Sequence, residues 1–119
     1  MSMKPDPQKV FINKYPGCVS CVVFHEGSRA RTSVASADEI EQGVWWVSRV
    51  KVHDRHHREG HGKRLVAAMK AACAELGADV VQVIPGGYNV PVARQRAFYA
   101  ACGFEPENEN GLMVWRPDG

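Results

Sequence analysis

The sequence predicts a mixed α/β fold, and three observations support that class. Short apolar segments separated by turns fill the first half of the chain, a pattern typical of antiparallel strands in a meander. A helix-spaced apolar pattern follows over residues 63–76, and a short apolar segment comes after it at 79–84. A strand, a helix and a strand in this order predict a parallel pair joined by a right-handed crossover. The 119 residues are expected to form one domain over 1–119, in which 1–8 is a loose polar tail.

The predicted strands are bounded by turn residues. The strands of the meander are expected at residues 18–24, 30–37 and 44–52, with turns near 26–27 and 41–43. A last strand is expected at 112–115. Trp45 and Trp46 are neighbours in the third strand, and successive strand residues face opposite ways. One of the two indoles is therefore expected in the core and the other on the opposite side of the sheet, with ordinary packing of both as the alternative.

Two helices are predicted from spacing and from their end signals. The apolar stripe of the first helix, at 63–76, consists of Leu65, Met69, Ala72 and Leu76. Gly77 follows as a C-terminal stop. The second helix is expected at 92–101, because Pro91 suits a first turn and Gly103 can end the helix in a left-handed conformation.

The stretch from Val50 to Leu65 is the most informative part of the chain. It leads from a predicted strand through a basic, glycine-containing turn into the first helix. The amides of a helix's first turn have no partner within the helix, and the helix dipole adds partial positive charge there. Gly60 and Gly62 keep side chains away from the backbone at this point. The stretch therefore predicts a cradle for a phosphorylated cofactor, with a solvated basic loop as the alternative.

The distribution of charge supports the phosphate interpretation. Between residues 49 and 64 six cations stand against two anions, which leaves this segment at +4 while the whole chain is at +2. The cations are Arg49, Lys51, Arg55, Arg58, Lys63 and Arg64. A positive field confined to one segment suits a compact polyanion better than a long nucleic acid duplex. The segment has neither the third glycine of a dinucleotide-binding turn nor the longer spacing of a Walker loop.

The same stretch resembles the cofactor-binding segment of the GNAT acyltransferases. Val52 stands at the strand-end valine of the family pattern, and Gly60 and Gly62 stand at its last two glycines. Leu65 takes the place of the apolar residue in the first helical turn. The resemblance implies a GNAT-like fold, in which helices flank a central, mixed and mostly antiparallel sheet with one parallel, splayed pair of strands at the cofactor cleft.

Two positions depart from the family pattern. His57 stands where the family usually has Arg or Gln, and Arg58 stands where it often has Gly. In the family, backbone amides of this loop bind the pyrophosphate of coenzyme A. The resemblance therefore implies that the backbone contacts survive both changes.

A second segment carries an independent resemblance. Residues 98–104 match the family's Leu-Tyr-x-x-x-Gly-Phe segment, with the same spacing from Tyr99 to Gly103 and Phe104. In the family this tyrosine lies beside the sulfur of coenzyme A and can protonate the leaving thiolate. The resemblance thus implies a catalytic role for Tyr99, and a half-buried core tyrosine is the alternative.

The resemblance also implies acetyl coenzyme A as cosubstrate and direct attack of a neutral amine on its thioester. The residues implied in cofactor binding are Val50, Val52, His57, Arg58, Gly60, His61, Gly62 and Lys63. The pantetheine arm is expected to bond the exposed backbone of strand 44–52, where that strand splays from the strand at 80–84. The amide of Val50 is then a candidate oxyanion donor.

No sequence motif identifies a general base. Glu39 and Glu41 precede the central strand, and either could act through a water if folded over the cleft. Glu41 is taken as the catalytic candidate, and two solvated turn carboxylates are the alternative. Ser48 is the only hydroxyl within the core of that strand and is expected to pack or bond locally.

No metal site is predicted. The four cysteines are Cys18, Cys21, Cys73 and Cys102. The first two form a single C-x-x-C in a predicted strand and the others stand alone on predicted helices, so no second ligand pair completes a zinc site. All four are expected to be reduced and structural. His57 and His61 are four residues apart, but the glycines around His61 leave their geometry undefined.

Three classes of function are compatible with the sequence. The first is an acetyl coenzyme A dependent N-acetyltransferase, the second a GNAT-fold module that binds coenzyme A without turnover, and the third a small basic nucleic-acid-binding domain. The first is favoured, and nucleic acid is the weakest because basic and aromatic residues do not interleave on one strand. The acceptor stays open between a protein lysine, an N-terminus, a polyamine, an aminoglycoside and a small amine. The N-terminal helices that often shape the family's acceptor site have little room.

Location and assembly are expectations of the same kind. The sequence has neither the apolar run of a signal peptide nor a membrane span. A cytoplasmic protein without membrane partners is therefore expected, and a homodimer is left open.

Overall fold

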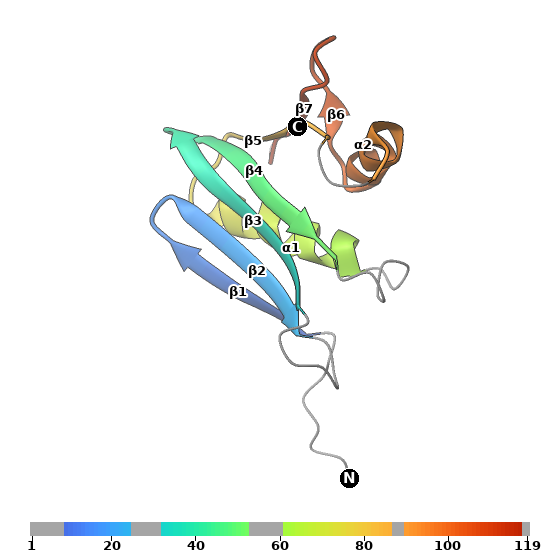
Figure 1. The fold of residues 1–119 in the computed structure, drawn as a ribbon. Helices are drawn as coiled ribbons and strands as arrows, with labels where there is room; N and C mark the ends of the chain where they lie inside the picture. The colour runs from blue at the N-terminus through green and yellow to red at the C-terminus, as the bar shows by residue number, and fades with distance from the viewer. Residues whose placement is uncertain (1–8, 25–31, 53–60, 87–89, 118–119) are drawn as a thin grey trace.

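The computed structural model describes residues 9–24, 32–52, 61–86 and 90–117. Its elements are, in chain order, β1 (Val10–Tyr15), β2 (Cys18–Phe24), β3 (Thr32–Glu41), β4 (Val44–Lys51), α1 (His61–Glu75), β5 (Val80–Val83), α2 (Val92–Ala101), β6 (Glu105–Pro106) and β7 (Met113–Trp115). The strands form one sheet in the order β1-β2-β3-β4-β5-β7-β6 (Figure 1). All neighbouring strands run antiparallel except β4 and β5, which are parallel. The mixed α/β class and the parallel pair are confirmed.

Most predicted elements are present, with small differences at their ends. β2 and α2 have the predicted bounds, and β3 runs four residues further than expected. α1 begins at His61, two residues earlier than predicted, so that Gly62 lies inside the helix. β1 and the two-residue β6 were not predicted. The turn expected at 26–27 lies outside the described residues.

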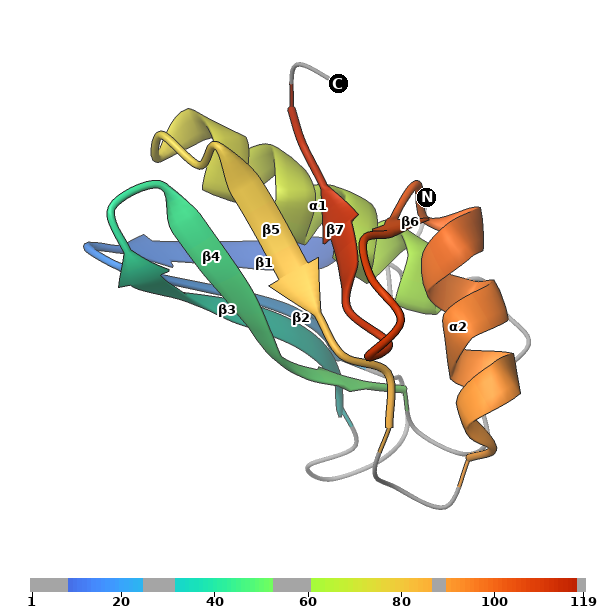
Figure 2. The same ribbon diagram turned by 90° about the horizontal axis from the view of Figure 1, so that it is seen from above.

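The helix α1 covers one face of the sheet, as Figures 1 and 2 show from two directions. Alternate residues of the strands point toward it, because side chains in a strand alternate between the two faces. In β2 the buried positions are Val19, Cys21 and Val23, and in β3 they are Ser33, Ala35 and Ala37. The face toward α1 is called the inner face below, and the opposite one the outer face.

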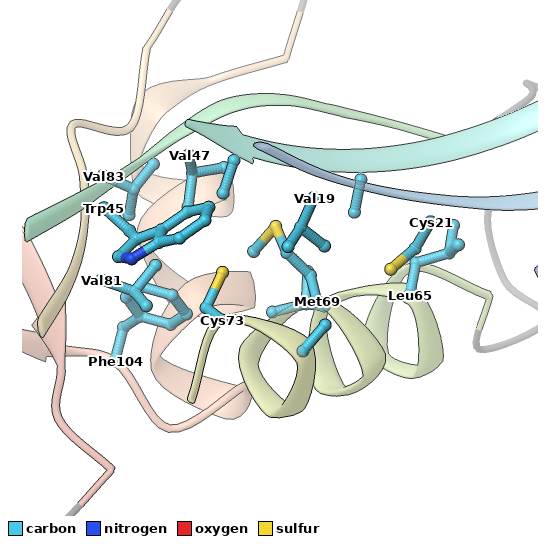
Figure 3. Packing of buried hydrophobic residues seen from close by; sticks show 14 of the residues in the cluster. Val19, Cys21, Trp45, Val47, Leu65, Met69, Cys73, Val81, Val83 and Phe104 are labelled. Carbon is cyan, nitrogen blue, oxygen red and sulfur yellow. The ribbon is translucent and has the colours of Figure 1, made fainter. Parts of the chain in front are cut away.

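The core lies between the inner face and α1. Figure 3 shows the indole of Trp45 beside Val47, Val81 and Phe104. Leu65, Met69 and Cys73 of α1 lie against the inner face, and all three are fully buried. Trp46 is only partly buried and belongs to the outer face. The prediction that the two indoles face opposite ways is confirmed.

One residue of the predicted helix stripe is placed differently. Leu76 was predicted on the apolar stripe of the helix, but it lies after the last residue of α1 and is 39% exposed. The helix ends there because Gly77 adopts φ +92° and the amide of Ala78 donates to the carbonyl of Cys73 at 2.9 Å. The turn carries Leu76 off the apolar stripe.

Candidate active site

β4 and β5 separate soon after they begin. Their pairing comprises three residues of each strand, from Val44 opposite Val80 to Trp46 opposite Gln82. β4 continues to Lys51 without a partner on this side among the described strands. Figure 1 shows β4 running down and away from β5. The gap between them is called the splay below.

A β-bulge lies where the separation starts. Ser36 of β3 pairs with Arg49, whereas the next residue of β3, Ala37, pairs with Val47, so Ser48 is an extra residue in β4. The hydroxyl oxygens of Ser36 and Ser48 are 3.0 Å apart, which confirms that Ser48 bonds locally. Because a bulge bends its strand and increases its twist, it turns the end of β4 away from β5.

The backbone of Val50 faces the splay, as the alternation of hydrogen bonds in the sheet requires. The amide of Glu39 donates to the carbonyl of Gly17 at 2.9 Å, so odd-numbered residues of β3 bond toward β2 and even-numbered ones toward β4. The partners of those even residues in β4 are Arg49 and Lys51. Val50, which lies between them, therefore presents its N–H and C=O away from β3.

The N-terminus of α1 lies next to α2 at the same end of the sheet. His61 and Gly62 open the helix and both are buried. A Cβ atom on Gly62 would lie 3.0 Å from Cε1 of Phe98 and 3.3 Å from Cγ2 of Val52. The missing side chain thus lets β4, α1 and α2 meet at one point. Gly62 makes room for the side chains of Phe98 and Val52. The sequence had suggested that it makes room for a bound cofactor.

His61 has a defined orientation at the start of α1. Its Nδ1 lies 2.9 Å from Nη2 of Arg64, and because a guanidinium can only donate, Nδ1 is the acceptor of this contact. The side chain of His61 is 2% exposed. Lys63, two residues further on, is exposed.

Tyr99 lies in α2 within an aromatic cluster. Its ring makes edge contacts with Phe98 and Phe104, at centroid distances of 5.2 and 5.6 Å, and the residue is 7% exposed. The end of α2 is closed as predicted by Gly103, at φ +94°, with the amide of Phe104 donating to the carbonyl of Tyr99 at 3.0 Å. Tyr99 is therefore buried and packed, as the alternative of a core tyrosine predicted. This packing does not decide whether its hydroxyl group is catalytic.

A lysine of α1 holds the end of α2 in place. Nζ of Lys70 donates to the carbonyl of Cys102, which follows the last residue of α2. The same ammonium lies 4.9 Å from the ring centroid of Trp115 in β7. Lys70 therefore links α1, α2 and β7, and it fixes the helix that carries Tyr99.

Glu39 and Glu41 lie at the other end of β4. Oε2 of Glu39 accepts the amide of Gly43 at 2.9 Å, so this carboxylate closes the turn between β3 and β4. Glu41 pairs with Val44, the first residue of β4. At about 3.3 Å per residue, Val44 is about 20 Å along the strand from Val50. The structure does not bring Glu41 to the splay.

Gln95 fixes the segment that leads from β5 to α2, a role that the sequence did not predict. Its Oε1 accepts the amide of Gly86 at 3.0 Å, and its Nε2 donates to the carbonyl of Val90 at 3.0 Å. The side chain thereby ties the end of the β5 segment to the start of α2. Three further predicted cofactor residues, His57, Arg58 and Gly60, lie outside the described residues.

All four cysteines are free thiols. Cys21 lies on the inner face of β2 and Cys18 on the outer face, so the C-x-x-C cannot converge on a metal. Burial raises the pKa of Cys21 to about 11 and that of Cys73 to about 12. Among the described residues, no three metal-ligating side chains lie close enough together to hold an ion.

The described helices are also too short or too polar to cross a membrane.

A splayed parallel pair beside a helix N-terminus, with a tyrosine on the neighbouring helix, is the arrangement expected of an acyl coenzyme A dependent acyltransferase. Residues 8–106 match the acetyltransferase (GNAT) domain family. The chain therefore belongs to the GNAT acetyltransferases, and it is an acyltransferase with acetyl coenzyme A as cosubstrate.

Solved structures show the same fold at low sequence identity. A Klebsiella pneumoniae protein assigned as an acyl-CoA N-acyltransferase has a TM-score of 0.68 at 16% identity, over 84% of this chain and 72% of that one. A Bacillus subtilis acetyltransferase in complex with CoA has 0.63 at 18%, over 83% and 76%. The anti-CRISPR protein AcrVA5 has 0.54 at 19%, over 89% and 97%. No curated protein matches the chain in sequence.

Proposed function

We propose that the protein transfers the acetyl group of acetyl coenzyme A to a primary amine by direct attack of the neutral amine on the thioester. The observation that supports this most strongly is the splay between β4 and β5, into which the backbone of Val50 points. No covalent acyl-enzyme is needed, because the two substrates meet in one site.

The cofactor is proposed to bind with its pyrophosphate at the N-terminus of α1. The helix dipole favours an anion there, and His61, Gly62 and Lys63 stand at that end. His57, Arg58 and Gly60 of the preceding segment are proposed to complete the cradle. From there the pantetheine arm would run along the splay and bond the backbone of β4 at Val50 and Val52.

Val50 and Tyr99 are proposed to act on the two ends of the bond that breaks. The amide of Val50 would donate to the carbonyl oxygen as negative charge develops on it. The amine nitrogen forms the new C–N bond as the C–S bond breaks, and Tyr99 gives its proton to the leaving thiolate. The acceptor nitrogen then loses a proton to water, and water returns a proton to the phenolate of Tyr99. Glu41 has no part in this proposal because it lies at the far end of β4.

The decisive experiment combines cofactor binding with turnover. Titration calorimetry with acetyl coenzyme A is expected to show saturable binding, and thiol release is then measured with a panel of amines. Tyr99→Phe is expected to lower kcat by about 100-fold, the low end for loss of a general acid, without changing cofactor affinity. The matched control is Tyr15→Phe, which removes an exposed hydroxyl of β1.

The outcomes separate the alternatives. Absence of cofactor binding by the folded protein would contradict the proposal as a whole. Binding with equal kcat in the parent and in Tyr99→Phe would leave Tyr99 as a packing residue. Binding without turnover of any amine would favour a coenzyme A binding module.

A further inference from the structure

The outer face of the sheet carries no helix of the described part of the chain (Figures 1 and 2). Its apolar residues are correspondingly exposed. Phe11 is 44% exposed and Phe24 is 56% exposed, and their rings form an edge contact at 5.5 Å. An apolar surface that a soluble protein leaves open is commonly an interaction site.

The strand registers place the outer-face residues in rows that cross the sheet. The first row, called the apolar row, consists of Phe11, Val22, Val34 and Lys51, each opposite the next on β1 to β4. The second, called the polar row, consists of Asn13, Ser20, Ser36 and Arg49. Neighbouring strands are about 4.8 Å apart, so each row spans about 14 Å. That is about the length of four residues of extended peptide, and it exceeds what one small amine occupies.

Both rows end in a cation at the splay. Arg49 and Lys51 are the last outer-face residues of β4, on the strand segment that has no β5 partner. Both side chains are exposed, and no ion pair joins either of them to another described residue. At the other end of the apolar row, Nζ of Lys9 lies 5.2 Å from the ring centroid of Phe11. Asp38 lies one row beyond the polar row, opposite Trp46, and so is further from this end of β4.

The rows lead directly to the proposed reaction site. The backbone of Val50 faces the splay, and the side chains on either side of it, Arg49 and Lys51, point to the outer face. An acceptor reaching Val50 from the outer face must therefore pass two positive charges. Such a field repels polycationic amines and attracts an acceptor with carboxylates near its amine.

We infer that the acceptor is a polypeptide segment with acidic residues beside its reactive amine, which docks on the apolar and polar rows and places its amine at the splay. This inference rests on the proposed function. Apolar side chains of the segment would cover the apolar row, and its carboxylates would face Arg49 and Lys51. Of the acceptors that the sequence left open, polyamines and aminoglycosides are disfavoured, because they are polycations and Arg49 and Lys51 repel them.

The test uses two eight-residue peptides that differ only in charge. Both have a free N-terminal amine, one lysine and one phenylalanine, and three positions are Asp in the acidic peptide and Arg in the basic one. Binding is measured by fluorescence anisotropy with a C-terminal label, with and without acetyl coenzyme A. Turnover is measured by thiol release, with spermidine as a third acceptor. The acidic peptide is expected to bind about tenfold more tightly than the basic one, since two exposed ion pairs are gained.

Variants assign any preference to these two cations. The double variant Arg49→Gln/Lys51→Gln is expected to lose the preference for the acidic peptide, and Arg49→Glu/Lys51→Glu to reverse it. Peptide binding to these variants is compared at saturating acetyl coenzyme A, because Arg49 and Lys51 also belong to the basic segment proposed to favour the cofactor. The matched control is Arg116→Gln, which removes one cation that is paired with Glu107 at 3.2 Å and should keep the preference.

Several results would overturn the inference. They are equal or tighter binding of the basic peptide by the parent, faster turnover of spermidine, and binding of a single-stranded oligonucleotide that depends on the same two cations. Failure of the proposed function gives a different pattern, because acetyl coenzyme A then fails to bind while the anisotropy of the acidic peptide still reports on the rows. Salt dependence adds a check, since exposed ion pairs weaken as ionic strength rises.

Discussion

At the scale of single residues, Gly62 shows how one missing side chain joins three elements. Its Cα approaches Phe98 and Val52 so closely that a Cβ atom would meet both. A helix interior normally gains from replacing glycine by a residue with a side chain, because the unfolded chain becomes less flexible. Here the packing cost opposes that gain, and the larger the side chain the larger the cost.

We therefore expect Gly62→Val to lower the free energy of unfolding by about 2 kcal/mol, within the usual range for overpacking. The substitution should also weaken acetyl coenzyme A binding, because α1 and α2 are pushed apart. Urea unfolding and calorimetry measure the two effects. In a Phe98→Ala background the same valine should cost little, and an undiminished cost in that double-mutant cycle would show that the ring is not the obstacle.

The buried thiols give the protein a defined response to alkaline pH. Burial raises the pKa of Cys21 to about 11 and that of Cys73 to about 12. In the unfolded chain a thiol ionises near pH 8.5, so the folded state holds these protons where the unfolded state has lost them. A folded state that keeps protons loses stability as pH rises, and the loss begins above the unfolded pKa.

Stability is accordingly expected to be constant with respect to these groups below about pH 8 and to fall between about pH 9 and pH 11. Each thiol contributes up to about 1.4 kcal/mol per pH unit in that range. Urea unfolding from pH 8 to 10.5 measures the slope. Cys73→Ala lowers stability at every pH through lost packing, but it should make the slope shallower. An unchanged slope would assign the alkaline response to other groups.

At the scale of elements, the bulge in β4 determines whether β4 and β5 stay together. Ser48 adds one residue to β4, while the pairs on both sides of it, Ser36 with Arg49 and Ala37 with Val47, keep their faces. Deletion of Ser48 would leave those two pairs adjacent and in register, and it would remove the bend. The serine side chain itself is of secondary importance, because its bond to Ser36 is between exposed hydroxyls.

Deletion of Ser48 is expected to give a folded protein with straighter β4 and at least tenfold weaker acetyl coenzyme A binding. Ser48→Ala keeps the extra residue and should bind nearly as well as the parent. Calorimetry on both variants, with circular dichroism to check folding, measures the difference. Equal affinity of a folded deletion variant would separate the bulge from the cofactor site.

Sequence reasoning located elements that carry local signals and missed those that do not. α2 was predicted with its bounds because Pro91 and Gly103 mark its ends, and both act as expected. β1 was missed because Phe11 and Ile12 are consecutive apolar residues on opposite faces, which breaks the alternation of a half-buried strand. Most residues of β1 are exposed, so burial does not impose a two-residue period on this strand.

The parts of the site that have a sequence motif were predicted, and the parts that depend on packing between distant segments were not. The glycine-containing segment and Tyr99 follow from motifs, whereas the contact of Gly62 with Phe98 depends on how two helices pack. The bulge at Ser48 has no local signal, since it appears only when β3 and β4 are paired. Gln95 was not predicted for the same reason, as its two partners become neighbours only after the chain turns between β5 and α2.

At the scale of the whole molecule, β1 is the edge of the sheet formed by the described strands. Its odd-numbered residues bond toward β2, so Val10, Ile12 and Lys14 present their backbone groups outward. Lys14 points to the inner face and pairs with Glu75 of α1 at 2.5 Å. A charged residue on the inner face of an edge strand discourages another strand from adding there.

We expect Lys14→Val to promote self-association, because the edge then offers an almost wholly apolar strand to a second copy. Glu75→Gln removes the ion pair but keeps the edge lysine, and it should leave the assembly state of the parent unchanged. Sedimentation velocity over a range of concentrations compares the three proteins. A variant with valine at this position that sediments like the parent would show that other features protect the edge.

The short pairing of β4 with β5 also divides the sheet into two parts, strands β1 to β4 and strands β5 to β7. Strands β1 to β4 follow one another as a meander of local contacts, whereas β5, β6 and β7 connect to them through three paired residues of each strand. Local contacts close with little loss of chain entropy, so the meander can form early and the C-terminal strands can join it later. We therefore expect the C-terminal strands to open before the meander does, with this short pairing as the boundary between two units of local unfolding. The short pairing of β4 with β5 would then both open the space for the cofactor and mark the boundary of local unfolding.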